Sequence, residues 1–168
     1  MIAQEVALNY PKGVNKLILC STNCGNPKSK LPSMDVLKRL NPEREDFSQE
    51  KIIENMASLL FTKEFKENNP KLIQEIKKTM KQNPIKPKAY QRQVNAILKF
   101  NSGKRLKKIR IPTLIIHGKK DVLIPFENAK ILSNLIPNSE MELFENGGHE
   151  IIFHEPEKVT KTILEFLR

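Results

Sequence analysis

The sequence has no tryptophan and no hydrophobic run that approaches the length of a membrane span. Apolar runs such as Leu17–Cys20 and Leu114–Ile116 have the size of a strand, whereas a membrane helix needs roughly 20 apolar residues. The N-terminus has no basic segment followed by an apolar one, so no secretory signal peptide is visible. We therefore expect a cytoplasmic protein without a membrane partner.

Cysteine is scarce as well, because the chain contains only Cys20 and Cys24. Their C-x-x-x-C spacing matches neither a zinc-binding pair nor a C-x-x-C redox pair. A short local disulfide is one interpretation of the spacing, and two reduced thiols are the interpretation that we expect. Neither cysteine predicts a bound metal, and no motif in the chain predicts a cofactor.

Positive charge is abundant, with a formal net charge of +10. Such a charge raises the question of a nucleic-acid partner. The lysines are scattered, however, and the tightest cluster, Gly103–Lys108, has no interleaved aromatic residues that could stack on bases. We therefore expect a lysine-rich solvated surface and no nucleic-acid partner. The overall composition, 39% hydrophobic and 29% charged over 168 residues, is ordinary for one globular domain.

The hydrophobic pattern at the N-terminus predicts a helix followed by a strand. Met1–Pro11 has the spacing of an amphipathic helix that ends at a proline. The apolar residues at helical spacing in this stretch are Ile2, Ala3, Val6 and Ala7. The nearly continuous apolar centre of Val14–Thr22 is typical of a strand that is buried on both faces in a parallel sheet.

The middle of the chain, from Ser33 to about Lys108, is predicted to be all helical. Ser33 and Ser48 stand where helix N-caps belong, and prolines begin two later helices. The last of these helices is expected to turn four residues inward, namely Tyr90, Val94, Ile97 and Leu98. Narrow apolar stripes and wide charged faces predict a helical lobe that lies on another part of the molecule.

After this lobe, short strands alternate with helices again. We predict strands at Thr113–Gly118 and Glu140–Asn146, and helices at Pro125–Pro137 and Glu155–Arg168. The final helix is expected to bury Val159, Ile163, Leu164, Phe166 and Leu167. The order of elements predicts an α/β fold with a parallel sheet and a helical insertion.

Two residues with useful chemistry follow two successive strands of this sheet. Asp121 comes just after the strand that ends near Gly118, and His149 comes just after the strand that ends near Asn146. The carboxyl ends of parallel strands share one edge, where ligands of open α/β sheets bind. A carboxylate there can hold an imidazole in one tautomer and stabilise its protonated form, as in a nucleophile–base–acid relay. Alternatively, Asp121 only caps the helix near Pro125, and His149 is a surface histidine.

A second pattern, His149 to His154, comes close to the zinc motif H-E-x-x-H. That motif places its histidines four residues apart on one helical face. Here they are five apart, which rotates the second by about 140° on a helix. We therefore predict no metal site, and we interpret His154 and His117 as structural residues.

These residues together resemble a family. The stretch from Ile111 to Leu167 resembles the end of an α/β-hydrolase, where an acid lies in a "G-x-x-D-x-x-x-P" turn and the general base in a "G-x-G-H"-like turn. Asp121 and His149 match these two positions. The resemblance implies a partial α/β-hydrolase fold: the last three parallel strands with flanking helices, plus an all-helical cap insertion. It implies domain parts 1–24 (core), 25–108 (cap) and 109–168 (core).

The family's nucleophile sits in a G-x-S-x-G elbow, and no such motif occurs in this chain. The opening helix resembles the helix that follows this elbow. The resemblance thus implies that the nucleophile, the oxyanion-hole donors and the first five strands are missing, and the nucleophile could be Ser, Asp or Cys. Ser21 and Cys20 end the first strand at the same sheet edge. We expect neither to replace the nucleophile, because neither should lie on a strained, exposed elbow with a helix directly behind it.

The leading hypothesis is a C-terminal portion of a hydrolase of esters, lactones or thioesters with a small-molecule acyl substrate. His149 would be its general base and acid, and Asp121 would orient His149. Alone, this chain should be inactive. The alternatives are a non-catalytic, hydrolase-derived binding module and a nucleic-acid-binding protein. The outer edge of Val14–Thr22 should be open, which predicts self-association through Leu17, Ile18 and Leu19 or pairing with a complementing N-terminal piece.

Overall fold

The computed structural model describes residues 1–25, 27–41 and 48–168. Residues 42–47 of the predicted helical region, and residue 26 of the predicted cap part, lie outside the described residues. Three parallel strands form a sheet in the order β1 (Leu17–Cys20), β2 (Thr113–Gly118) and β3 (Ser139–Phe144). The expected parallel α/β arrangement is thus confirmed. None of the helices in the described part of the chain is long and apolar enough to cross a bilayer.

The remaining elements are helices, with two short 3-10 turns. In chain order they are α1 (Ile2–Asn9), η1 (Pro11–Gly13), α2 (Met34–Leu40), α3 (Gln49–Leu60), α4 (Lys63–Asn68), α5 (Pro70–Gln82), α6 (Pro87–Lys99), η2 (Leu106–Lys108), α7 (Glu127–Leu135), α8 (Ile151–His154) and α9 (Pro156–Leu167).

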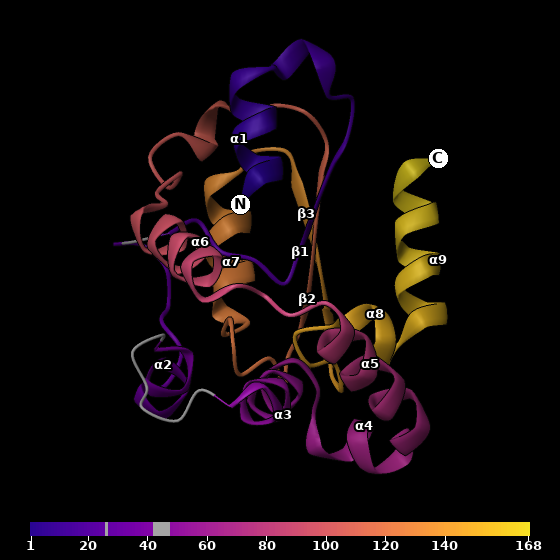
Figure 1. Ribbon diagram of the computed structural model, residues 1–168. Helices are drawn as coiled ribbons and strands as arrows, with labels where there is room; N and C mark the ends of the chain where they lie inside the picture. The colour runs from indigo at the N-terminus through magenta and orange to yellow at the C-terminus, as the bar shows by residue number, and fades with distance from the viewer. Residues whose placement is uncertain (26, 42–47) are drawn as a thin grey trace.

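Helices cover both faces of the sheet, with α9 on one side and α1 and α7 on the other (Figure 1). Side chains alternate between the faces of β2. Ile115 packs in a cluster with Ala7 of α1 and Leu132 of α7. Leu114 and Ile116 pack in a second cluster with residues of α8 and α9. Every residue of β2 is buried, which is the pattern of a central parallel strand.

β1 is shorter and less buried than the sequence predicts. Its pairing with β2 covers Leu17–Cys20 rather than Val14–Thr22. Leu17 and Leu19 are buried on the α1 and α7 side, while Ile18 and Cys20 are only partly buried on the other face. Within the described part of the chain, β1 is an edge strand, so its outer rim meets no further strand.

The inward face of α1 also differs from the prediction. Ala7 is buried, but Ile2 is 83% exposed and Val6 is 42% exposed. The polar Gln4 is fully buried in their place. Its Nε2 donates to the carbonyl of Asn23 at 3.0 Å, and its Oε1 accepts from Ser102 Oγ at 2.6 Å. A buried amide is tolerated when both of its ends are hydrogen-bonded, which apolar spacing alone does not reveal.

Two helices keep part of their predicted apolar face exposed. In α6, Ile97 is 50% and Leu98 60% exposed, so the prediction that they turn inward is wrong. In α9, Val159 is buried as predicted, but Leu164 and Leu167 remain about half exposed. Each of these helices contacts the rest of the described structure along a stripe narrower than its apolar residues occupy.

Helices α2 to α6 make up the helical lobe; α3, α4 and α5 lie near the carboxyl ends of the strands, whereas α6 lies further from these ends (Figure 1). Ser33 and Ser48 act as the predicted N-caps, since each side chain accepts a backbone N–H of the first turn. The separate helix α4 was not predicted. The two stems of the lobe meet where Gly25 pairs with Asn101. Gly25 has φ +78°, and a Cβ there would lie 1.9 Å from a backbone oxygen, so this position requires glycine.

The turns after β2 and β3 are packed backbone against backbone. A Cβ on Gly118, the last residue of β2, would lie 2.2 Å from the carbonyl oxygen of Gly147. The N–H of Lys120 donates to that same carbonyl at 2.9 Å, and the N–H of Lys119 donates to Phe144 O at 2.8 Å. Only a residue without a side chain fits at Gly118, and the two turns are thereby held in register.

We expect Gly118→Ala to destabilise the fold strongly. The added methyl group meets rigid backbone, and overpacking of this kind costs about 3 kcal/mol or prevents folding. Gly13→Ala is the matched control, because a Cβ at Gly13 meets nothing within 4 Å. Its effect on the free energy of unfolding, measured by urea denaturation, should stay within about 0.5 kcal/mol. Equal effects of the two variants would contradict this account of Gly118.

We expect the outer edge of β1 to pair with a strand of a second copy. The N–H groups of Leu17 and Ser21 donate to the β2 side, so the N–H of Ile18 points to the open edge. Because Leu17 and Leu19 are buried, the backbone rather than these side chains is available for pairing. Light scattering should detect dimers or larger species, which Ile18→Pro should shift toward monomers.

The control for this prediction is Ile2→Lys, which changes the most exposed apolar residue of α1 and leaves the edge of β1 intact. It should not alter the association. A monodisperse monomer of the parent chain would show that the β1 edge stays unpaired in solution.

Candidate active site

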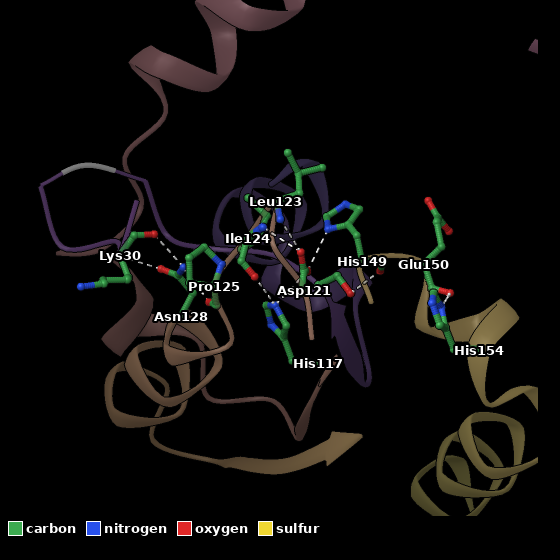
Figure 2. A network of polar contacts seen from close by, with 11 residues as sticks. Lys30, His117, Asp121, Leu123, Ile124, Pro125, Asn128, His149, Glu150 and His154 are labelled. Carbon is green, nitrogen blue, oxygen red and sulfur yellow. Dashed lines mark hydrogen bonds and ion pairs between the residues drawn. The ribbon is translucent and has the colours of Figure 1, made fainter. Parts of the chain in front are cut away.

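Asp121 lies in the turn after β2, and all its carboxylate hydrogen bonds come from neighbouring loops and the strand itself (Figure 2). Oδ1 accepts the backbone N–H of Leu123 at 2.9 Å and of Ile124 at 2.8 Å. Oδ2 contacts Nδ1 of His149 at 2.9 Å and Nε2 of His117 at 3.2 Å. Four donors therefore fix the carboxylate in one orientation.

The alternative role of Asp121, as a helix cap, does not fit this geometry. Helix α7 begins at Glu127 rather than near Pro125 as predicted, because Pro125 belongs to the preceding turn, where its carbonyl accepts the N–H of Asn128. Asp121 caps its own turn and leaves Oδ2 for the two imidazoles.

The pKa of Asp121 reflects a balance between burial and hydrogen bonding. Burial of the carboxyl group is the largest single influence and would raise its pKa. The hydrogen bonds from His117 and His149, the charge of His149 and the backbone N–H of Ile124 outweigh it together, so the pKa lies below its ordinary value. Asp121 is therefore held as a carboxylate at neutral pH.

His149 follows Gly147 and Gly148 in the turn after β3. Its Nδ1 donates to Asp121, which places the ring proton there and leaves Nε2 as the nitrogen that can accept another proton. The ring keeps 20% of its surface exposed, whereas the Asp121 side chain is fully buried. The two residues predicted from the sequence are thus adjacent, with the carboxylate inside and the imidazole at the surface.

His117 is a contact of Asp121 that sequence reasoning missed. The prediction placed it at a strand end as a structural residue, and it is fully buried at that point. Its Nε2 also contacts the carbonyl of Ile124 at 2.8 Å, while its Nδ1 has no hydrogen-bond partner among the described residues. This arrangement favours a proton on Nε2 that is shared between the carbonyl and Asp121. A buried polar residue inside an apolar strand was the signal in the sequence.

His154 joins the His149 turn to the helical lobe. Its Nε2 accepts the backbone N–H of Thr62 at 3.2 Å, and its Nδ1 lies 2.9 Å from the carbonyl of Glu150. The N–H of Glu150 donates to Leu60 O at 3.2 Å. His154 ends α8 rather than beginning the last helix. Because α8 begins only at Ile151, His149 and His154 do not share a helix. No group of three or more metal-binding side chains occurs among the described residues.

Cys20 and Ser21 stand at the same edge but are poorly suited as nucleophiles. Both cysteines are free, as expected, and burial raises the pKa of Cys20 to about 11, so it stays a thiol. Ser21 does lie on strained backbone, with φ +43°, which corrects the expectation of an unstrained residue. Its hydroxyl, however, donates to the backbone carbonyl of His149 at 2.7 Å rather than to the ring.

A cavity of about 220 Å³ lies between the helical lobe and the turns that follow β2 and β3. It is lined by Ser58, Leu59, Phe61, Thr62, Lys63, Lys120, Val122 and Gly148. A larger depression of about 470 Å³ runs along β3 and α9 and includes no residue of the Asp121 or His149 turns. The smaller cavity is lined by the sequence neighbours of Asp121 and His149, namely Lys120, Val122 and Gly148, and not by these two residues themselves.

Known proteins are similar to this chain in sequence. The AB hydrolase superfamily protein YisY from Bacillus subtilis is 32% identical over 117 residues, which cover 61% of this chain and 44% of the relative. A 2-hydroxy-6-oxononadienedioate/2-hydroxy-6-oxononatrienedioate hydrolase from Burkholderia vietnamiensis is 27% identical over 173 residues, covering 99% of this chain and 58% of the relative.

A solved structure is similar to this chain as well. A thermophilic esterase from Thermogutta terrifontis matches 99% of this chain and 60% of its own, with 25% identity and a TM-score of 0.79. The chain thus spans about half of the length of the relatives it matches. The family model of the alpha/beta hydrolase fold matches residues 1–156. This chain belongs to the α/β-hydrolase family.

Proposed function

We propose that the chain supplies the acid and the base of a cytoplasmic α/β-hydrolase that cleaves esters, lactones or thioesters. One observation carries the proposal: Nδ1 of His149 lies 2.9 Å from Oδ2 of Asp121, at the carboxyl ends of two neighbouring parallel strands. This is the contact through which a carboxylate sets the tautomer of a general base. The relatives named as an esterase and a dioate hydrolase support a hydrolytic reaction.

The chemistry assigned to His149 has two proton transfers. Nε2 first takes the proton of the nucleophile as the nucleophile bonds to the carbonyl carbon of the substrate. It then gives this proton to the departing alcohol or thiol as the carbon–oxygen or carbon–sulfur bond breaks. Asp121 stays ionised and stabilises the imidazolium between the two transfers. Water repeats the sequence to release the acid product.

The nucleophile is proposed to lie outside these 168 residues, which contain no G-x-S-x-G motif. Ser21 and Cys20 are not assigned to this role, because the Ser21 hydroxyl is bonded to a carbonyl and Cys20 is a buried thiol. A serine is the favoured nucleophile, and a cysteine would transfer its proton in the same way. An aspartate, the third residue type left open, is already ionised at neutral pH and would imply another reaction class. Without this nucleophile, the chain alone should not hydrolyse its small-molecule acyl substrate.

The helical lobe is assigned the role of a cap over the substrate. It lies over the His149 turn, and the cavity of about 220 Å³ between them has apolar walls at Leu59, Phe61 and Val122. Lys63 and Lys120 line the same cavity. A cavity of this size suits a small acyl group rather than a long chain.

A serine-directed fluorophosphonate probe tests where the nucleophile is. The 168-residue chain should take up no stoichiometric label, whereas a full-length serine esterase labelled in parallel should. A longer protein, expressed from this coding sequence together with its in-frame upstream DNA, should be labelled at the serine of a G-x-S-x-G motif. In that longer protein, His149→Ala should slow the labelling by about 10³-fold or more. Labelling of the unextended chain that disappears in Ser21→Ala would instead make Ser21 the nucleophile.

The ionised state of Asp121 predicts a specific loss of stability in acid. Its folded pKa is lowered, so its contribution is complete above the unfolded value of about 3.9 and is lost as pH falls through the lower folded value. Asp121→Asn should cost about 1–3 kcal/mol at pH 7, and the difference from the parent should shrink toward pH 3. Urea denaturation at pH 7, 5 and 3 measures both.

Asp35→Asn is the matched control for this series. Asp35 is 77% exposed and lies 3.6 Å from Arg39 on the surface of α2, so its replacement should have little effect at any of the three pH values. A cost for Asp121→Asn that stays constant from pH 7 to pH 3 would contradict a depressed pKa of Asp121.

A further inference from the structure

Ser21 has an unusual backbone for its residue type. It directly follows β1, and its φ of +43° lies in the left-handed region, the only positive φ among the non-glycine residues that the structure describes. A residue with a Cβ adopts this conformation at a cost, and such strain persists only where the surroundings hold it in place. Ser21 is also largely buried, with 9% of its surface exposed.

Two hydrogen bonds hold Ser21 in this conformation. Its N–H donates to the carbonyl of Ile116 at 3.0 Å and continues the ladder between β1 and β2. Its Oγ donates to the carbonyl of His149 at 2.7 Å. Because the strand order is β1-β2-β3, this hydroxyl reaches past the end of β2 to the turn that follows β3. The strained turn therefore connects the two outer strands of the sheet at the edge where Asp121 lies.

The bond acts on the residue proposed as the base. Gly147, before His149, packs against Gly118, and Glu150, after it, donates its N–H to Leu60. Ser21 holds the carbonyl of His149 itself. With the peptide fixed on both sides and at its own carbonyl, the Cα–Cβ bond of His149 has one direction, and that direction brings Nδ1 to Asp121.

The turn after β1, which contains Ser21, is also anchored by α1. The carbonyl of Asn23 accepts from Gln4 Nε2 at 3.0 Å. Gln4 is fully buried, so this anchor is part of the core. A shift of α1 is thereby coupled to Ser21 and, through its hydroxyl, to His149.

We propose that Ser21 is a positioning residue for His149: its strained backbone and its hydroxyl fix the peptide of the base so that the imidazole meets Asp121. The catalytic meaning of this role rests on the proposed function. The geometric claim does not, because the position of the His149 ring is measurable in the 168-residue chain without any turnover.

Histidine NMR tests the proposal. The chain has three histidines, so His117, His149 and His154 give three ring Cε1–H signals. Ser21→Ala removes the hydroxyl and keeps the strain, while Ser21→Gly removes the hydroxyl and relieves the strain. In both variants we expect the His149 signal to move and its Nδ1–H proton to exchange with water roughly fivefold faster or more. The His117 signal is expected to respond as well, because its ring shares Asp121 Oδ2 with His149, whereas the His154 signal, whose ring does not contact Asp121, should stay in place.

Thr22→Val is the matched control, since it removes the neighbouring hydroxyl, which contacts Met1 rather than His149. Its His149 signals should coincide with those of the parent. If Ser21→Ala fails to fold, Ser21→Gly still decides the question, because it carries no strain. His149 signals that are unchanged in Ser21→Gly, or a His154 signal that moves as far as the His149 signal, would overturn the positioning role.

Discussion

One carboxylate oxygen organises the candidate site. Oδ2 of Asp121 is shared by two imidazoles, and Oδ1 is occupied by two backbone N–H groups of its own turn. A buried charge survives only when donors surround it, and here the donors come from β2, from the turn that follows it and from the turn after β3. The carboxylate therefore links these three segments, and their hydrogen bonds in turn keep it charged.

The backbone around this carboxylate is equally constrained. Gly118 allows the turns after β2 and β3 to touch without intervening side chains. Ser21 ties the end of β1 to the carbonyl of His149, and His154 accepts an N–H from the helical lobe. Gly118, Ser21 and His154 thus have the same effect, which is to limit the positions open to the imidazole of His149.

Much of this arrangement follows from the sequence, and the exceptions have physical causes. The strand at Thr113–Gly118, the caps Ser33 and Ser48, and the nearness of Asp121 to His149 follow from apolar runs, capping chemistry and parallel topology. The burial of Gln4 and the sharing of Asp121 with His117 depend on hydrogen bonds between distant segments, which periodicity does not encode. The exposed Ile97 and Leu98 of α6 show that an apolar face predicts where a helix is able to pack, not where it does.

The stems of the helical lobe have a thermodynamic consequence. Since Gly25 pairs with Asn101, and Ser102 donates its N–H to Cys24 at 2.9 Å, the core holds both ends of the insertion side by side. For folding of the core, the insertion then counts as one closed loop. The entropic free-energy cost of closing a loop grows only logarithmically with its length, by about 0.6 kcal/mol for each doubling. Helices can be added to or removed from the lobe at little expense to the sheet. The part of the molecule that shapes the cavity is thus free to vary in length, while the part that holds Asp121 against His149 is not.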